Sequence, residues 1–95
     1  MSVDATLAER GSRYGDFSGH AVIAQVIHNA MRGVYPGVKT QWDELSADKK
    51  QALTVIADKI ARILNPGADA EYRDNWHDIQ GYAKLAEDRC TGEPA

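Results

Sequence analysis

The chain lacks the features of a secreted or membrane-spanning protein. Its single cysteine, Cys90, excludes an internal disulfide bond and is typical of a reducing compartment. No apolar run comes near the ~20 residues that a membrane-spanning helix needs. The N-terminus has no basic-then-apolar signal pattern. These absences predict a cytoplasmic protein with no membrane partner.

Zinc-site spacing is also missing, and positive charge is scarce. The histidines His20, His28 and His77 have neither an i, i+4 partner nor a neighbouring cysteine, so we expect them at the surface or boundary. Basic residues number 11 against 14 acidic ones, without a block of like charge. Because duplex-binding domains usually carry a basic stripe, nucleic acid is disfavoured as a partner, and so is a helix-turn-helix.

What is present is enough for one small domain. With 95 residues, we expect a single helical domain over residues 1–95, with flexible segments at 1–9 and 91–95. A chain of this length buries about two-thirds of its unfolded surface, which supports only a modest core. Because 43% of its residues are apolar, a partner surface would add to that core. The chain is therefore predicted to form a homo-oligomer, with exposed apolar contacts along 34–42.

Apolar residues recur every three to four positions in three stretches, which is typical of amphipathic helices. The predicted helices cover 18–32, 46–64 and 70–90, and Ser18 and Ser46 are the expected N-caps of the first two. No window alternates like a strand. The pattern predicts an all-α fold, a small bundle of three main helices with a short N-terminal helical turn.

Glycine and proline mark the ends of these elements. Gly11 is expected to end the N-terminal turn over 4–10, and Asn65-Pro66-Gly67 is a helix stop signal. This short connection predicts an antiparallel hairpin of the second and third main helices. The residues expected on buried faces are Ile23, Val26, Ile27, Ala30, Met31, Ala52, Leu53, Ile56, Ile60, Ile63, Leu64, Tyr72, Trp76, Ile79, Ala83 and Ala86.

Polar residues lie beside these apolar faces when each residue is placed about 100° on from the last. They are Lys59 and Arg62 on the second main helix, and Asp74, Asn75, Asp78 and Tyr82 on the third. Asp58 points the opposite way, toward solvent. A buried amide or carboxylate is costly unless it is paired. We call the six residues the polar edge.

The polar edge has two interpretations. The favoured one is a structural ion-pair network, in which Lys59 or Arg62 bridges Asp74 or Asp78 across the hairpin, because such networks are common. The other is a ligand site, in which Lys59 and Arg62 face a phosphate while Asp74 and Asp78 coordinate a cation. A buried Asn75 would need a hydrogen-bond partner in either case.

The segment 10–18 offers a second place for an anion. Arg10, Arg13 and Tyr14 precede a helix N-terminus, where backbone N–H groups attract phosphate. The alternative is an ordinary helix-entry turn with Tyr14 and Phe17 packed as anchors. The turn is favoured, because the glycines lack the spacing of a Walker or Rossmann loop.

Three stretches resemble a phage-encoded family of unknown function, over residues 9–89. They are Arg10-Gly-Ser-Arg-Tyr-Gly-Asp-Phe17, Lys59-Ile-Ala-Arg62 and Asp74-Asn-Trp-His-Asp-Ile-Gln-Gly-Tyr-Ala83. That family carries an Arg-Tyr-Gly turn, a Lys-Ile-Ala-Arg helix and an Asp-Asn-x-x-Asp-Ile-x-Gly-Tyr-Ala motif. The resemblance implies an all-α protein of a phage or prophage, working in the cytoplasm of a bacterial host. It implies no reaction.

More distantly, the chain is similar to the MazG-like nucleotide pyrophosphohydrolases. Members of that all-α family bind magnesium through Glu-x-x-Glu and Glu-x-x-Asp on adjacent helices, so the similarity implies nucleotide handling and, for an enzyme, magnesium-dependent hydrolysis. This chain departs from the pattern. It offers only Asp58 on one helix, with Asp74 and Asp78 on the next. The departure favours nucleotide binding without hydrolysis.

Two hypotheses about function follow. In the first, a phage or prophage accessory protein binds a nucleotide or phosphate at the polar edge, with Mg²⁺ as a candidate cofactor. Its candidate ligand-binding residues are Lys59, Arg62, Asn75, Asp78, Tyr82, Arg13 and Tyr14, and its candidate metal ligands are Asp74 and Asp78. The alternative is a non-enzymatic, homo-oligomeric interaction protein that modulates a host factor. The first requires an open polar edge, and the second an exposed apolar patch.

Overall fold

A computed structural model describes residues 2–92 of the chain as four α-helices and one short 3-10 turn, without a strand in that range. The elements are α1 (Val3–Tyr14), α2 (Phe17–Met31), η1 (Trp42–Glu44), α3 (Ala47–Leu64) and α4 (Arg73–Glu87). The predicted all-α class is therefore confirmed. The expected short turn at the N-terminus is a fourth helix of 12 residues.

The first helix is longer than predicted because Gly11 does not end it. A glycine inside a helix costs only about 1 kcal/mol relative to alanine, and α1 continues to Tyr14. The helix ends before Gly15, whose positive φ of 78° favours glycine over other residues.

The N-cap of α2 also differs from the prediction. Asp16 precedes the helix, and its carboxylate accepts a hydrogen bond from the backbone N–H of Gly19 at 3.1 Å. Ser18 therefore lies inside the first turn of α2 and does not cap it. Aspartate and serine are about equally good caps, so two of them only two positions apart leave the start ambiguous.

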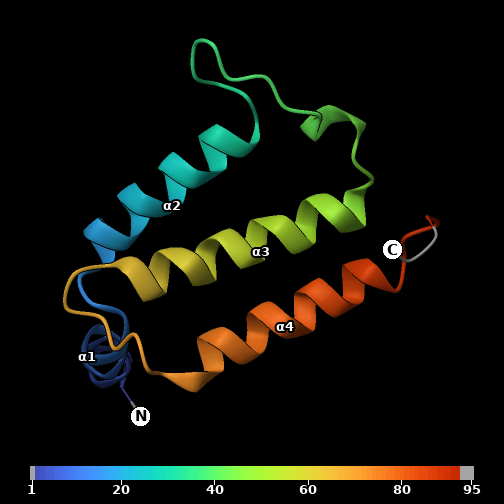
Figure 1. Cartoon of the computed structure of the whole chain (residues 1–95). Coiled ribbons are helices and arrows are strands. Elements are labelled where there is room, and N and C mark those ends of the chain that lie inside the picture. Colours follow the sequence, from blue (N-terminus) through green and yellow to red (C-terminus); the bar gives the residue numbers. More distant parts are fainter. Residues whose placement is uncertain (1, 93–95) are drawn as a thin grey trace.

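The last two helices form the predicted antiparallel hairpin (Figure 1). Helix α3 follows Ser46 as expected, although the Ser46 hydroxyl bonds to Asp48 and makes no bond to a helix N–H. Helix α4 begins at Arg73, three residues later than predicted. The indole N–H of Trp76 donates to the Ala70 carbonyl at 2.9 Å, which fixes the turn before it.

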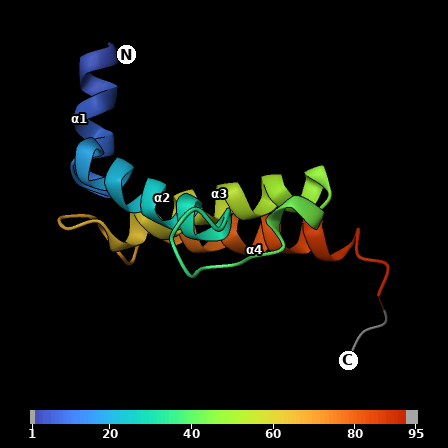
Figure 2. The same cartoon turned by 90° about the horizontal axis from the view of Figure 1, so that it is seen from above.

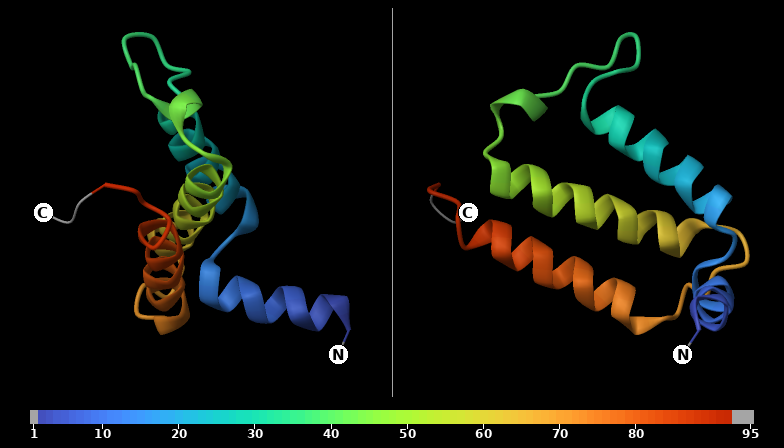
Figure 3. Two further views of the ribbon diagram at one scale, coloured as in Figure 1. Left: turned by 90° about the vertical axis from the view of Figure 1, so that its right-hand side faces the viewer. Right: turned by 180° about the vertical axis from the view of Figure 1, so that it is seen from behind.

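Helices α2, α3 and α4 lie side by side in a layer one helix thick, with α3 in the middle (Figures 1 and 3). The molecule measures 45 × 32 × 22 Å. Helix α1 projects from one face of the layer at the end where α2 begins (Figures 2 and 3). Within residues 2–92, no helix covers the opposite face of the layer.

The buried core is much smaller than predicted. Within residues 2–92, its fully buried apolar residues are Ala24, Ala52, Ala57 and Ala61. Ile56 and Ile79 are only half-buried, Ala83 is exposed and Trp76 is 52% exposed. The prediction of buried faces holds for Ala52 and is wrong for Trp76 and Ala83, because helices in a single layer contact neighbours only at their flanks.

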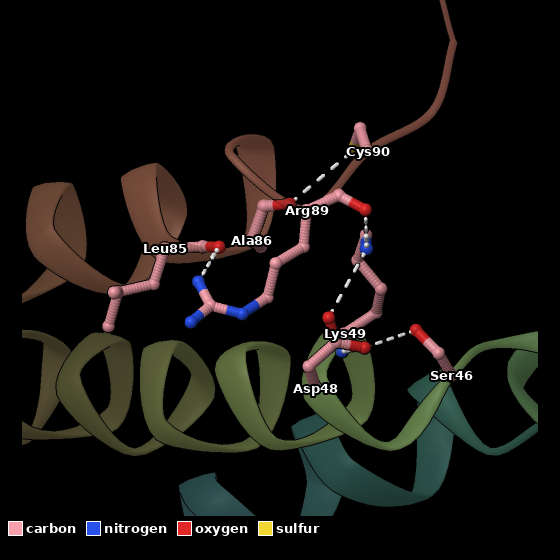
Figure 4. Close-up of polar contacts among 7 residues, drawn as sticks. All are labelled: Ser46, Asp48, Lys49, Leu85, Ala86, Arg89 and Cys90. Carbon is pink, nitrogen blue, oxygen red and sulfur yellow. Dashed lines mark hydrogen bonds and ion pairs between the residues drawn. The ribbon is translucent and has the colours of Figure 1, made fainter.

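The open end of the hairpin is closed by backbone contacts (Figure 4). The Lys49 ammonium at the start of α3 donates to the Arg89 carbonyl at 3.2 Å, and the Arg89 guanidinium donates to the Leu85 carbonyl at 2.8 Å. The Lys49 bond connects the two ends of the hairpin next to Cys90, whereas the Arg89 guanidinium bond stays within the end of α4. Of the tail expected over 91–95, residues 93–95 lie outside the described part of the chain.

Candidate functional site

The centre of the polar edge is an ion pair between α3 and α4. The Lys59 ammonium lies 2.8 Å from a carboxylate oxygen of Asp78, and the lysine side chain is mostly buried. The hydrogen bond from Lys59 lowers the pKa of the Asp78 carboxyl below its usual value of 3.8. The two residues therefore form the cross-hairpin bridge that the structural interpretation requires.

Asp74 does not join this pair. Its carboxylate accepts a hydrogen bond from the Tyr72 hydroxyl at 2.9 Å, and that bond raises the pKa of the Tyr72 phenol above 10.0. Asp74 and Asp78 thus serve different partners, and residues 2–92 contain no cluster of three or more histidine, cysteine, aspartate or glutamate side chains. Magnesium binding at Asp74 and Asp78 stays a prediction.

Asn75 is the most deeply buried polar residue of the edge, at 1% exposure. Its amide nitrogen has no hydrogen-bond partner within residues 2–92. Lys59 is engaged with Asp78, and Tyr82 lines a separate shallow hollow of about 230 Å³ together with Arg89. The polar edge is therefore a buried amide beside an ion pair, with Tyr82 facing another part of the surface.

Arg62 belongs to a different neighbourhood from the one predicted. Its guanidinium lies 4.7 Å from the centroid of the Tyr14 ring, and it forms no ion pair within residues 2–92. Arg13 lies 4.9 Å above the Tyr72 ring and pairs with Glu9 at 2.5 Å. The Tyr14 and Tyr72 rings meet edge to face at 6.1 Å. Arg62 and Tyr14 are thus brought together, while Lys59 pairs with Asp78.

Asn65, which the sequence indicated only as part of a helix stop signal, holds the turn after Tyr14 in place. Asn65 is 4% exposed, and its amide nitrogen donates to the carbonyls of Tyr14 and Asp16, both at 2.8 Å. A Cβ at Gly15 would lie 2.7 Å from the Pro66 carbonyl oxygen, so only glycine fits this close approach. Local sequence patterns give no signal for a contact between segments 50 positions apart.

The opposite flank of α3 carries a second polar pair. Nε2 of buried His28 lies 3.3 Å from a carboxylate oxygen of Asp58, although the two atoms are not in hydrogen-bonding geometry. His28, predicted at the surface or boundary, is buried, whereas Asp58, predicted to face solvent, keeps a side chain that is 40% exposed and also lies against His28. The physical reason is that α2 packs on the side of α3 that bears Asp58.

The positions of these two pairs show which face of the layer lacks a neighbouring helix. His28–Asp58 places α2 and Lys59–Asp78 places α4 on opposite flanks of α3. At about 100° per residue, the isoleucines of α3 point between the two flanks, and the apolar arcs of α2 and α4 turn to the same side. We call this surface the apolar face, and it consists of Ile23, Ile27, Ile56, Ile60, Ile63, Trp76, Ile79 and Ala83. None of the eight is fully buried.

Helix α1 leaves this face uncovered. Arg62 points away from the isoleucines on the helical wheel, and it shares a cleft with α1 residues Arg10 and Tyr14. Helix α1 therefore stands on the polar side of the layer. Searches for similar proteins matched no family model, no curated protein and no solved structure. None of the helices within residues 2–92 has the length and apolar character needed to span a membrane.

Proposed function

We propose that the protein is a non-enzymatic interaction protein that works as a homodimer, in which the apolar faces of two copies pack together. One observation carries the proposal: the isoleucines and Trp76 of the apolar face are not fully buried, while the fully buried apolar residues within 2–92 are all alanines. Burying an isoleucine fully contributes about 1.5–3 kcal/mol relative to exposure. A single copy leaves part of that contribution unused, because these isoleucines are only half-buried in it.

The dimensions of one copy support a partner of substantial size. The accessible surface is 6886 Å², whereas a compact chain of this mass exposes about 5400 Å². The radius of gyration is 15.4 Å, against about 13 Å for a compact domain of ~100 residues. The excess of about 1500 Å² exceeds the ~800 Å² that each partner buries in a standard interface. It suits an obligate dimer.

The polar edge favours the same proposal over a nucleotide site between α3 and α4. A phosphate that binds Lys59 would have to displace the Asp78 carboxylate at 2.8 Å. The phosphate would then only replace a carboxylate that already neutralises Lys59, and it would leave Asp78 without its partner. The ion pair is therefore better explained as the bond that fixes α4 against α3 beside the apolar face.

The biological setting is proposed from the family resemblance alone. A phage or prophage origin, a bacterial cytoplasm and a host protein as target are what the motifs imply. A small dimer suits such a role, because doubling the chain gives two identical outer surfaces for one target. The outer surface of α2, with exposed Val22 and Val26, is the candidate contact.

The direct test is the mass of the full chain in solution. We expect light scattering to give twice the 10.4 kDa chain mass across micromolar concentrations. Ala83→Lys should convert the dimer to a monomer, because it adds a charge to an alanine that is exposed in one copy and covered in the dimer. Ala47→Lys is the matched control, since this exposed alanine lies on α3 opposite the isoleucines.

Two results would overturn the proposal. One is a monomeric wild type at high concentration. The other is an equal loss of mass in the Ala83 and Ala47 variants, because it would place the contact outside the apolar face. Circular dichroism checks that both variants keep their helix content, so that unfolding is not mistaken for dissociation.

A further inference from the structure

Helices α1, α2 and α3 enclose a cleft on the polar side of the layer, with a volume of about 480 Å³. We infer that this cleft binds a phosphate monoester that carries a planar aromatic group. The residues that carry the inference are Arg10 and Tyr14 of α1, Phe17 and His20 of α2, and Arg62 of α3. The volume lies within the ~300–1,000 Å³ of ligand pockets. The inference is independent of the proposed dimer, which uses the other face.

Two guanidinium groups supply the charge for an anion. Neither Arg10 nor Arg62 forms an ion pair within residues 2–92, although acidic residues outnumber basic ones in the chain. Arg62 is positioned by the face of the Tyr14 ring at 4.7 Å, which directs it without neutralising it. Guanidinium forks match phosphate oxygens bidentately, and a monoester carries a charge of about −1.5 to −2 near pH 7.

One carboxylate also lines the cleft, and it already has a partner. Asp16 accepts the backbone N–H of Gly19 at 3.1 Å as the N-cap of α2. Its charge is therefore directed at the positive end of that helix. The two arginines leave the lining with a net positive charge, which disfavours a neutral ligand or a cation.

An aromatic wall stands beside the arginines. Phe17 is 79% exposed, and its ring lies 6.3 Å from the His20 ring at a tilt of 37°. A phenyl ring that faces water next to a cleft gains contact area when a planar group stacks on it, by about 1–3 kcal/mol for a nucleobase. Leu7, also exposed, lines the same cleft. The aromatic part of the ligand would stack on Phe17.

The floor of the cleft is already ordered without a ligand. Asn65 bonds to the carbonyls on both sides of Gly15, and the Asp69 N–H donates to the Arg13 carbonyl at 2.7 Å. These bonds fix the turn that joins Tyr14 to α2. Less conformational entropy is then lost on binding, which favours a specific site over a loose electrostatic contact.

The experiment is calorimetric titration of the full chain in magnesium-free buffer. The probes are adenosine 5′-monophosphate and phenyl phosphate, with inorganic phosphate and adenosine as the two halves of the ligand. We expect both monoesters to bind more tightly than either half. Arg10→Met and Arg62→Met should each weaken monoester binding at least about tenfold, which corresponds to ~1.4 kcal/mol. Phe17→Ala should abolish the advantage of the monoesters over inorganic phosphate.

The control is Arg89→Met, an exposed arginine that follows α4, lies beside the start of α3 (Figure 4) and does not line the cleft. It should bind the monoesters as the wild type does. The inference fails if the wild type binds no monoester at millimolar concentration, if the double variant at Arg10 and Arg62 still binds, or if the Arg89 variant loses as much. Light scattering on the same samples shows separately whether the dimer persists.

Discussion

His20 titrates in an environment that disfavours its charged form. Burial, and then the positive charge of Arg62, lower its pKa below 6.5, while Asp58 opposes the shift in part. Between the lowered value and 6.5 the unfolded chain binds more protons than the folded one. The free energy of unfolding should therefore fall as the pH drops through that window.

His20→Gln should remove this part of the pH dependence, because glutamine does not titrate. The measurement is urea denaturation at several values between about pH 5 and pH 8, with His77→Gln on exposed α4 as the control. A wild-type and a His20 variant with parallel stability profiles would contradict the prediction.

Asn75 is a buried amide whose nitrogen lacks a partner within residues 2–92. We expect Asn75→Leu to leave the free energy of unfolding unchanged or to raise it by about 1–3 kcal/mol, because the desolvation cost of the amide disappears. Asn75→Asp should lower it, since a buried carboxylate costs more than an amide. Chemical denaturation measures both, and a clear loss in the leucine variant would show that the amide makes a required contact.

Single-helix reasoning placed Asn75 within the buried arc and predicted a bridge from Lys59 or Arg62 to Asp74 or Asp78, of which the structure forms Lys59–Asp78. Both depend only on the spacing within a hairpin. The same reasoning missed the partners of Asp58 and Arg62. Their partners are His28 on α2 and Tyr14 on α1, and a helical wheel has no information about which helix arrives at which flank.

At the scale of elements, Asn65 connects the α1–α2 turn to the end of α3. Asn65→Ala removes both hydrogen bonds and leaves the buried carbonyls of Tyr14 and Asp16 without this donor. We expect a loss of about 1–3 kcal/mol in the free energy of unfolding. Thermal denaturation checks it against Asn29→Ala on α2, a half-buried asparagine. Equal losses in the two variants would mean that the bonds to the turn contribute little.

The helices themselves were predictable because their signals are local. Apolar periodicity and the Asn65-Pro66-Gly67 stop identified three of the four helices, and Ser46 marked the start of α3 correctly. The errors fell where two equivalent signals stand close together. Gly11 and Gly15 are both candidate helix ends, and only the backbone conformation at Gly15 distinguishes them.

At the scale of the whole molecule, stability should depend on concentration. If two copies share the apolar face, the melting temperature rises with protein concentration by mass action. Ile56→Ala should then lower the stability of the dimer by about 2–5 kcal/mol per chain, as for a fully buried isoleucine. Calorimetry over tenfold dilutions measures both. A melting temperature independent of concentration would contradict the shared face.

The apolar stripe of α3 could be predicted from the sequence, but what packs against it could not. Periodicity shows that Ile56, Ile60 and Ile63 share one side of a helix, and it is the same whether that side meets another helix or a second chain. A small core of alanines and a layer one helix thick become visible only when the neighbours of α3 are known.

The attachment of α1 has a kinetic consequence. This helix has no buried residue, so separating it from the layer exposes little apolar surface and requires mainly the loss of the bonds at Asn65 and Asp69. Such local opening costs far less free energy than global unfolding. Amide hydrogens of α1 should therefore exchange with solvent well before those of α3. A ligand bound between Arg10 and Arg62 would slow the exchange of the α1 amides selectively, because it would connect α1 to α3.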